Sequence, residues 1–71
     1  MIPVYPVLRQ RMREQGIGSK EVAAAAEISL LAFYMRILGI KQWELPEVVR
    51  ICCFFRTSDA EHLFVRKHTK P

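Results

Sequence analysis

Apolar residues recur along this chain at intervals of three and four positions, the period that places side chains on one face of an α-helix. The first such run extends from Pro6 to Gln15. Proline is tolerated at the start because the amide that it lacks would have no acceptor in a first helical turn, and Gly16 can end the helix. The pattern predicts a helix over residues 6–15, whose apolar positions are Val7, Leu8 and Met12.

A second helix is predicted to open at Gly18 or Ser19. Glu21 would lie in its first turn, where a carboxylate meets the positive end of the helix dipole. The run of alanines over 23–26 is a strong helix former, and small side chains allow another helix to approach closely.

A third helix is predicted directly after the second. Ser29 is a good N-cap for it, and we expect it to run to Leu38 and to stop at Gly39. Residues 19–39 therefore have the spacing of two short helices joined by a tight turn, an arrangement in which the second helix can lie in a groove of DNA.

Two further helices complete the chain. Residues 40–44 are expected to form a loop, and a fourth helix to begin near Leu45, with Pro46 acceptable in its first turn. Ser58 and Glu61 match the S/T-x-x-E capping box, so the fifth helix is expected to begin at that serine. The apolar positions are Val48, Val49, Ile51, Cys52 and Phe55 in the fourth helix, and Leu63 and Phe64 in the fifth.

No segment alternates polar and apolar residues with a period of two, so no sheet is expected. The predicted fold is all-α, a compact bundle of five helices in one domain over residues 6–65. An extended segment, 1–5, would precede it, and a basic, disordered tail, 66–71, would follow. A chain of 71 residues has little room for an enclosed pocket, so an enzyme is not expected.

The chain ends and the cysteines limit the function classes further. The N-terminal MIPVYPV is too short and too interrupted by proline for a signal sequence or a membrane span. We therefore expect a cytoplasmic protein with no membrane partner. Cys52 and Cys53 are adjacent and far from both histidines, so they do not match a metal site or a disulfide framework. One thiol is expected to be buried and the other partly exposed, and no metal or cofactor is expected.

The charge of the chain favours a polyanionic partner such as nucleic acid. Eleven Lys and Arg against seven Asp and Glu give a formal net charge of +4 and a pI near 9.5. The surplus is local, since residues 1–20 and 28–43 are basic whereas 44–61 hold four acids against two arginines. One side of the protein should therefore be less positive than the other.

Several segments together resemble the lambda-repressor-like (Cro-like, XRE) helix-turn-helix family, and more narrowly its small prophage-encoded bacterial members. The similarity extends from Tyr5 to Phe64 and is carried by LRQRMREQGI at the first helix, EVA at the second, IS at the turn, Gly39, LPEVVRI, and FRTSDAEHLF at the end. The resemblance implies a transcriptional regulator that binds double-stranded DNA by occupying an operator. It also implies a homodimer, which we expect to form through the fifth helix and the loop before the fourth, because such proteins bind two half-sites.

One exchange within the pattern supports the fold. Many family members pair an arginine and a glutamate beneath the third helix, and those positions fall here on Met12 and Ile37. An ion pair replaced as a unit by packed apolar residues can be neutral or stabilising. Both side chains are therefore expected in the core.

The resemblance assigns DNA contacts to four polar residues. Ser19, with Lys20 beside it, falls where the second helix of the family aims its N-terminus at a phosphate. Arg36, at the expected exposed end of the third helix, and Lys41, in the loop after it, fall at positions that contact the DNA backbone. The alternatives are that Ser19 only caps its helix and that the two cations are solvated surface charges.

The base-reading positions of the family fall on apolar residues in this chain. Leucine has no donor or acceptor for a base edge and could only press on a thymine methyl group, while a tyrosine could give one hydrogen bond. DNA binding should then depend on phosphates and shape, with weak or AT-biased sequence preference. The four positions are Leu30, Leu31, Tyr34 and Met35.

A rival hypothesis gives the same four side chains a protein partner. If Phe33 and Ile37 face the core, the four project outward as an apolar patch, and such patches often mark interfaces. The helix-turn-helix would then serve homodimerisation or bind another protein. In a third interpretation the helix is rotated, and some of the four belong to the core.

Overall fold

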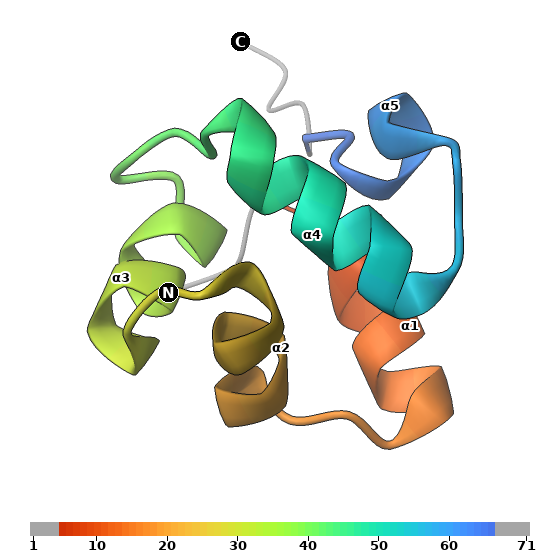
Figure 1. The fold of residues 1–71 in the computed structure, drawn as a ribbon, viewed down its shortest axis with the longest axis horizontal. Coiled ribbons are helices and arrows are strands. Elements are labelled where there is room, and N and C mark those ends of the chain that lie inside the picture. Colours follow the sequence, from red (N-terminus) through yellow and green to blue (C-terminus); the bar gives the residue numbers. More distant parts are fainter. Residues whose placement is uncertain (1–4, 67–71) are drawn as a thin grey trace, which may run out of the picture.

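The structure is a computed structural model that describes residues 5–66. Over this range the protein is all-helical. Five helices and no strand are present in this range (Figure 1), so the prediction of a compact all-α bundle of five helices is confirmed. The expected extended segment before Tyr5 and the basic tail from Lys67 onward lie outside the described residues. The helices are α1 (Pro6–Gln15), α2 (Ser19–Ala26), α3 (Leu30–Ile37), α4 (Leu45–Phe55) and α5 (Ala60–Leu63).

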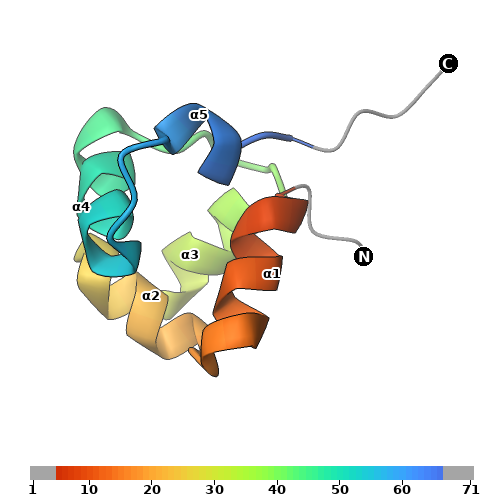
Figure 2. The same ribbon diagram turned by 90° about the vertical axis from the view of Figure 1, so that its right-hand side faces the viewer.

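The helices enclose a single apolar core. α4 packs against α2 and α5, α2 packs against α3, and α1 packs against α5. Figure 1 shows α4 crossing the near side of the molecule in front of α1, and the turned view in Figure 2 shows these two helices on opposite sides of the bundle. Each helix thus contributes one face to the core and leaves its other face outward.

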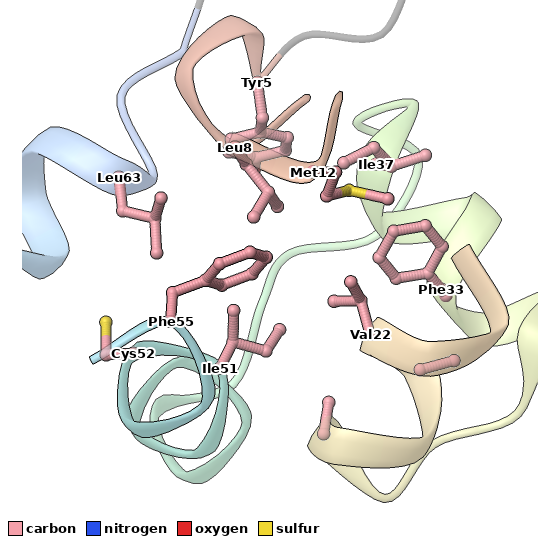
Figure 3. Close-up of a cluster of buried hydrophobic side chains, with 12 residues drawn as sticks. Tyr5, Leu8, Met12, Val22, Phe33, Ile37, Ile51, Cys52, Phe55 and Leu63 are labelled. Atoms are coloured by element: carbon pink, nitrogen blue, oxygen red, sulfur yellow. The ribbon is translucent and has the colours of Figure 1, made fainter. Parts of the chain in front are cut away.

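The side chains at the centre of the bundle come from all five helices (Figure 3). Met12 and Ile37 are both buried in this cluster, so the prediction that they lie in the core is confirmed. Phe33 is also buried, which fixes the face that α3 turns inward. The buried apolar residues are Tyr5, Leu8, Met12, Val22, Ala23, Ala26, Phe33, Ile37, Ile51, Cys52, Phe55 and Leu63.

Capping geometry confirms the predicted end of α1 and the predicted starts of α2 and α3, whereas α3 ends at Ile37, one residue earlier than expected. Gly16 ends α1 in the left-handed region at φ 66°, a conformation that glycine adopts without steric cost. Gly18 is the N-cap of α2, and its N–H donates to the carboxylate of Glu21 at 3.4 Å. The Oγ of Ser29 accepts from the N–H of Ala32 at 3.1 Å, as expected of an N-cap.

The predicted start of the last helix is wrong by one residue. Asp59, not Ser58, is the N-cap of α5, and its Oδ1 accepts from the N–H of His62 at 3.0 Å. The N–H of Asp59 donates in turn to Oγ1 of Thr57 at 3.2 Å. Aspartate caps a helix as well as serine does, and here the better-placed oxygen belongs to the aspartate, so the S-x-x-E pattern does not form its box.

One residue of the predicted apolar stripe on α4 faces solvent. The buried side of this helix centres on Ile51 and Phe55. Val49 lies two residues before Ile51, which places it about 160–200° from Ile51 around the helix. Val49 is accordingly exposed, whereas Cys52 is buried. Cys53 is exposed, so the expected contrast between the two free thiols is confirmed.

An aromatic cluster joins the two ends of the described chain to its longest loop. Trp43, in the loop before α4, packs edge-on against Phe64, with ring centroids 5.3 Å apart, and against Phe33 at 6.0 Å. Tyr5 contacts the rings of Trp43 and Phe64 at 6.3 and 6.2 Å. The guanidinium of Arg66 lies 5.8 Å from the centroid of the Tyr5 ring, within the range of a cation–π contact.

Candidate nucleic-acid interface

A basic pocket lies where α1 faces the start of α2. It has a volume of about 220 Å³ and is lined by Arg9, Met12, Arg13, Ile17, Gly18 and Ser19. The two arginines are four residues apart, so they lie on the same face of α1. Neither forms an ion pair with a carboxylate within the described residues. The pocket therefore joins two guanidinium groups to a helix N-terminus.

The start of α2 adds hydrogen-bond donors to this pocket. The amides in the first turn of a helix have no acceptor within it and carry a partial positive charge. Ser19, the first residue of α2, lines the pocket, and Lys20 beside it is exposed. The nearby Glu21 carboxylate, which accepts from Gly18, offsets part of the positive charge.

The two pocket arginines were missed as site residues from the sequence. The sequence indicated these arginines only through the positive net charge of residues 1–20. The signal that could have identified them is their spacing of four on a helix that leads directly into the next helix N-terminus. This spacing distinguishes them from Arg11, which lies about 200° around α1 from either one and does not line the pocket.

Arg36 occupies a different environment from the one expected. Its Nε donates to Oε1 of Glu47 at 2.7 Å, and its Nη2 donates to Oε2 at 3.1 Å. Its Nη1 donates to the carbonyl of Ala32 at 3.2 Å. The two charged side chains are only 11% and 8% exposed, so the expectation of an exposed Arg36 is wrong. All three nitrogens already donate within the protein, and the side chain joins α3 to the first turn of α4.

Lys41 is exposed in the loop after α3, as expected for a residue that could contact a phosphate. Its backbone N–H donates to the carbonyl of Met35 at 3.2 Å, which ties this part of the loop to the end of the helix. Lys41 therefore has a fixed backbone and a free side chain.

The outward face of α3 is apolar and accessible. Leu31 is 70% exposed and Tyr34 is 44% exposed, while Leu30 and Met35 are half-buried. The Tyr34 ring packs edge-on against Phe33 at 6.0 Å. None of the four belongs to the buried core, so the interpretation in which α3 is rotated to bury some of them is wrong.

Other kinds of site find little support in the described range. Within residues 5–66, no group of three or more His, Cys, Asp and Glu side chains could hold a metal ion. No helix in that range combines the length and the apolar character needed to cross a bilayer.

The thiol of Cys52 is a titratable group whose environment changes its pKa. Burial raises this pKa, and the charges of Cys53 and Asp59 raise it further. The raised pKa keeps the thiol protonated.

Comparisons with protein-family models, with curated proteins and with solved structures give no match for this chain. The resemblance to lambda-repressor-like proteins therefore stays a prediction from the sequence. A functional assignment rests on the surfaces of the molecule itself.

Proposed function

We propose that this protein binds double-stranded DNA and acts as a transcriptional regulator of the lambda-repressor-like type, with α2 and α3 as its helix-turn-helix. The observation that carries the proposal is the pocket in which Arg9 and Arg13 lie beside Ser19 at the start of α2. Guanidinium groups and first-turn amides are the donors that bind phosphate oxygens in proteins. The formal net charge of +4 agrees with a polyanionic partner.

In this mechanism a DNA phosphate enters the basic pocket. The amides at the start of α2 and the hydroxyl of Ser19 donate to its oxygens, while Arg9 and Arg13 neutralise its charge. Lys20 and Lys41 contact neighbouring phosphates from exposed positions. These contacts fix the position of the protein on the duplex without reading its sequence.

Arg36 then has a different role from the phosphate contact that the resemblance assigned to it. Its ion pair with Glu47 holds α3 against the start of α4, which orients the helix that enters the groove. The outward side chains of α3, Leu31 and Tyr34, offer apolar contact and one hydroxyl group. Because paired Arg–guanine or Gln–adenine contacts are absent from this helix, sequence preference is weak.

Titration with duplex DNA at several salt concentrations tests the proposal. Removal of one phosphate contact should reduce the slope of log affinity against log salt by about 0.9. Arg13→Gln is therefore expected to weaken binding and to lower the slope by about that amount. Arg11→Gln, the same charge change on the opposite side of α1, serves as the matched control and should leave the slope nearly unchanged. Absence of binding at low salt would refute the proposal.

The apolar face of α3 favours a second candidate function, a protein-interaction module on the same scaffold. Leu31, at 70% exposed, is the specific observation, because a large exposed side chain within an apolar patch often marks an interface. If α3 binds protein, Leu31→Glu should abolish capture of a partner or self-association, and the unmodified protein should not bind DNA. DNA binding at low salt with no partner captured would exclude this candidate.

A further inference from the structure

Two neighbouring side chains of α4 contact both helices of the proposed helix-turn-helix. Glu47 and Arg50 are three residues apart, so they lie side by side along α4. Glu47 pairs with Arg36, one residue before the last residue of α3. Nη1 of Arg50 donates to the carbonyl of Ala26, the last residue of α2, at 3.2 Å. α4 therefore reaches α2 where the turn begins and α3 at the end farthest from that turn.

The contact with α2 supplies a cation that the end of this helix lacks. The last carbonyls of a helix have no donor within it and carry a partial negative charge. α2 has no basic residue in its last turn, and the guanidinium of Arg50 compensates this charge from another helix. Nε of the same arginine lies 3.5 Å from Oε2 of Glu27, the C-cap residue of α2. Arg50 thus makes two contacts with the end of α2.

The contact with α3 restricts a helix that has few other neighbours. Among the helices in residues 5–66, α3 packs closely against α2 alone. Phe33 and Ile37 turn one face of α3 into the core, but apolar burial is not directional, so it fixes the buried face more than the tilt of the helix. The two bonds between Arg36 and Glu47 have a defined geometry. They therefore restrict the tilt that core packing leaves free.

Stability gives no sufficient reason for this buried ion pair. The two side chains are only 11% and 8% exposed, so both lose hydration when the protein folds. Replacement of such a pair as a unit by apolar residues is often neutral or stabilising. The pair differs from an apolar contact chiefly in the direction that it imposes on α3.

We propose that Glu47 and Arg50 are positioning residues, which together set the angle between α2 and α3. Arg50 fixes the end of α2 at the turn, and Glu47, through Arg36, fixes the far end of α3. The angle determines whether the outward face of α3 fits a groove of DNA while the start of α2 binds a phosphate. This consequence rests on the proposed function, whereas the angle is a property of the free protein.

Residual dipolar couplings of the backbone amides measure the angle between α2 and α3 without DNA. Arg36→Met combined with Glu47→Leu replaces the buried pair as a unit, so this double variant should fold. The angle should differ from that in the unmodified protein. Asp59→Ala, which removes the cap of α5 and lies on neither helix, is the control and should keep the angle. An unchanged angle in the double variant overturns the proposal.

A single variant on the surface keeps the proposal testable if the double variant fails to fold. Arg50→Ala removes both contacts with the end of α2, and because the arginine side chain is 41% exposed, the variant should fold. The angle between α2 and α3 should change here too. An unchanged angle in Arg50→Ala excludes the role assigned to this arginine.

DNA binding distinguishes a positioning role from a general loss of stability. In the double variant the preference for thymine over uracil should fall from about fourfold to about one, because Leu31 no longer reaches the bases. The pocket should still bind a phosphate, so adding Arg13→Gln should still lower the salt slope by about 0.9. Loss of the phosphate contact together with the thymine preference would contradict a positioning role.

The two measurements separate this inference from the proposed function. If the unmodified protein does not bind duplex DNA at low salt, the proposed function fails, and the angle in the free protein still decides whether the two residues of α4 set it. If DNA binds and both variants keep the angle and the thymine preference, the positioning role fails and the proposed function stands.

Discussion

Arg36 on α3 and Glu47 on α4 form a two-bond ion pair that is almost fully removed from solvent. Oε1 of the same glutamate also accepts from the N–H of Glu44 at 3.1 Å, so its carboxylate caps the start of α4 as well. One carboxylate thereby fixes the position of the third helix and the first turn of the fourth.

Removal of one partner of this pair should be costly. Glu47→Gln leaves the Arg36 guanidinium buried without a counter-charge, and we expect the free energy of unfolding to fall by about 3 kcal/mol. Glu27→Gln, which removes the partner of the exposed Arg50, should cost less than about 1 kcal/mol. Urea denaturation measures both. Equal losses in the two variants would mean that the burial of the first pair has no energetic effect.

The corrected start of α5 leads to a second prediction. Asp59→Ala removes the side chain that accepts from His62 and should lower the free energy of unfolding by about 1 kcal/mol. Ser58→Ala should have nearly no effect, because that hydroxyl makes no capping hydrogen bond. Thermal denaturation of the two single variants distinguishes them. A larger loss of stability in Ser58→Ala than in Asp59→Ala would support the capping box at Ser58 that the sequence predicts.

The adjacent thiols should differ in reactivity. Under native conditions iodoacetamide is expected to modify the exposed Cys53 first, since Cys52 is buried and its pKa is raised by that burial. Mass spectrometry of partly modified protein locates the label. Preferential labelling of Cys52 in the folded protein would contradict its buried position.

The raised pKa of Cys52 also predicts a pH dependence of stability. The folded protein retains a proton that the unfolded chain releases, so this contribution is complete below the unfolded pKa and is lost as pH rises through the folded one. The free energy of unfolding should therefore fall at alkaline pH, and less steeply in Cys52→Val. Identical slopes in the two proteins would exclude this thiol as the cause.

The apolar face of α3 predicts how the protein would sense DNA bases. If Leu31 presses on a thymine methyl group, a duplex with uracil in place of thymine should bind about fourfold more weakly for each methyl contacted. The reason is that each missing methyl removes the burial of one apolar carbon group on binding. Leu31→Ala should lose this sensitivity. Equal affinity for the two duplexes would leave phosphate contacts as the whole of the interaction.

The helices could be predicted from the sequence because their ends depend on local chemistry. Gly16 and Ser29 act within one turn of their own position, and both were identified correctly. The side that α4 buries depends instead on which helices pack against it, so Val49 could not be assigned to solvent by periodicity alone. The interaction of Arg36 with Glu47 joins residues eleven positions apart on different helices, and no local pattern indicates it.

The site was predicted less completely than the fold, for the same reason. Ser19 and Lys20 follow from a helix start that the sequence marks clearly. The pocket also needs Arg9 and Arg13, and their place beside that start depends on the angle between α1 and α2. That angle is set by core packing and cannot be read from spacing along the chain.

The aromatic cluster gives the molecule a built-in optical probe. Trp43 is the only tryptophan in the chain, and the Nε1 atom of its indole is buried without a hydrogen-bond partner. Its fluorescence should shift to longer wavelength when water reaches the ring. Because Tyr5 and Phe64 both contact this ring, its emission reports the release of either end of the described chain from the bundle.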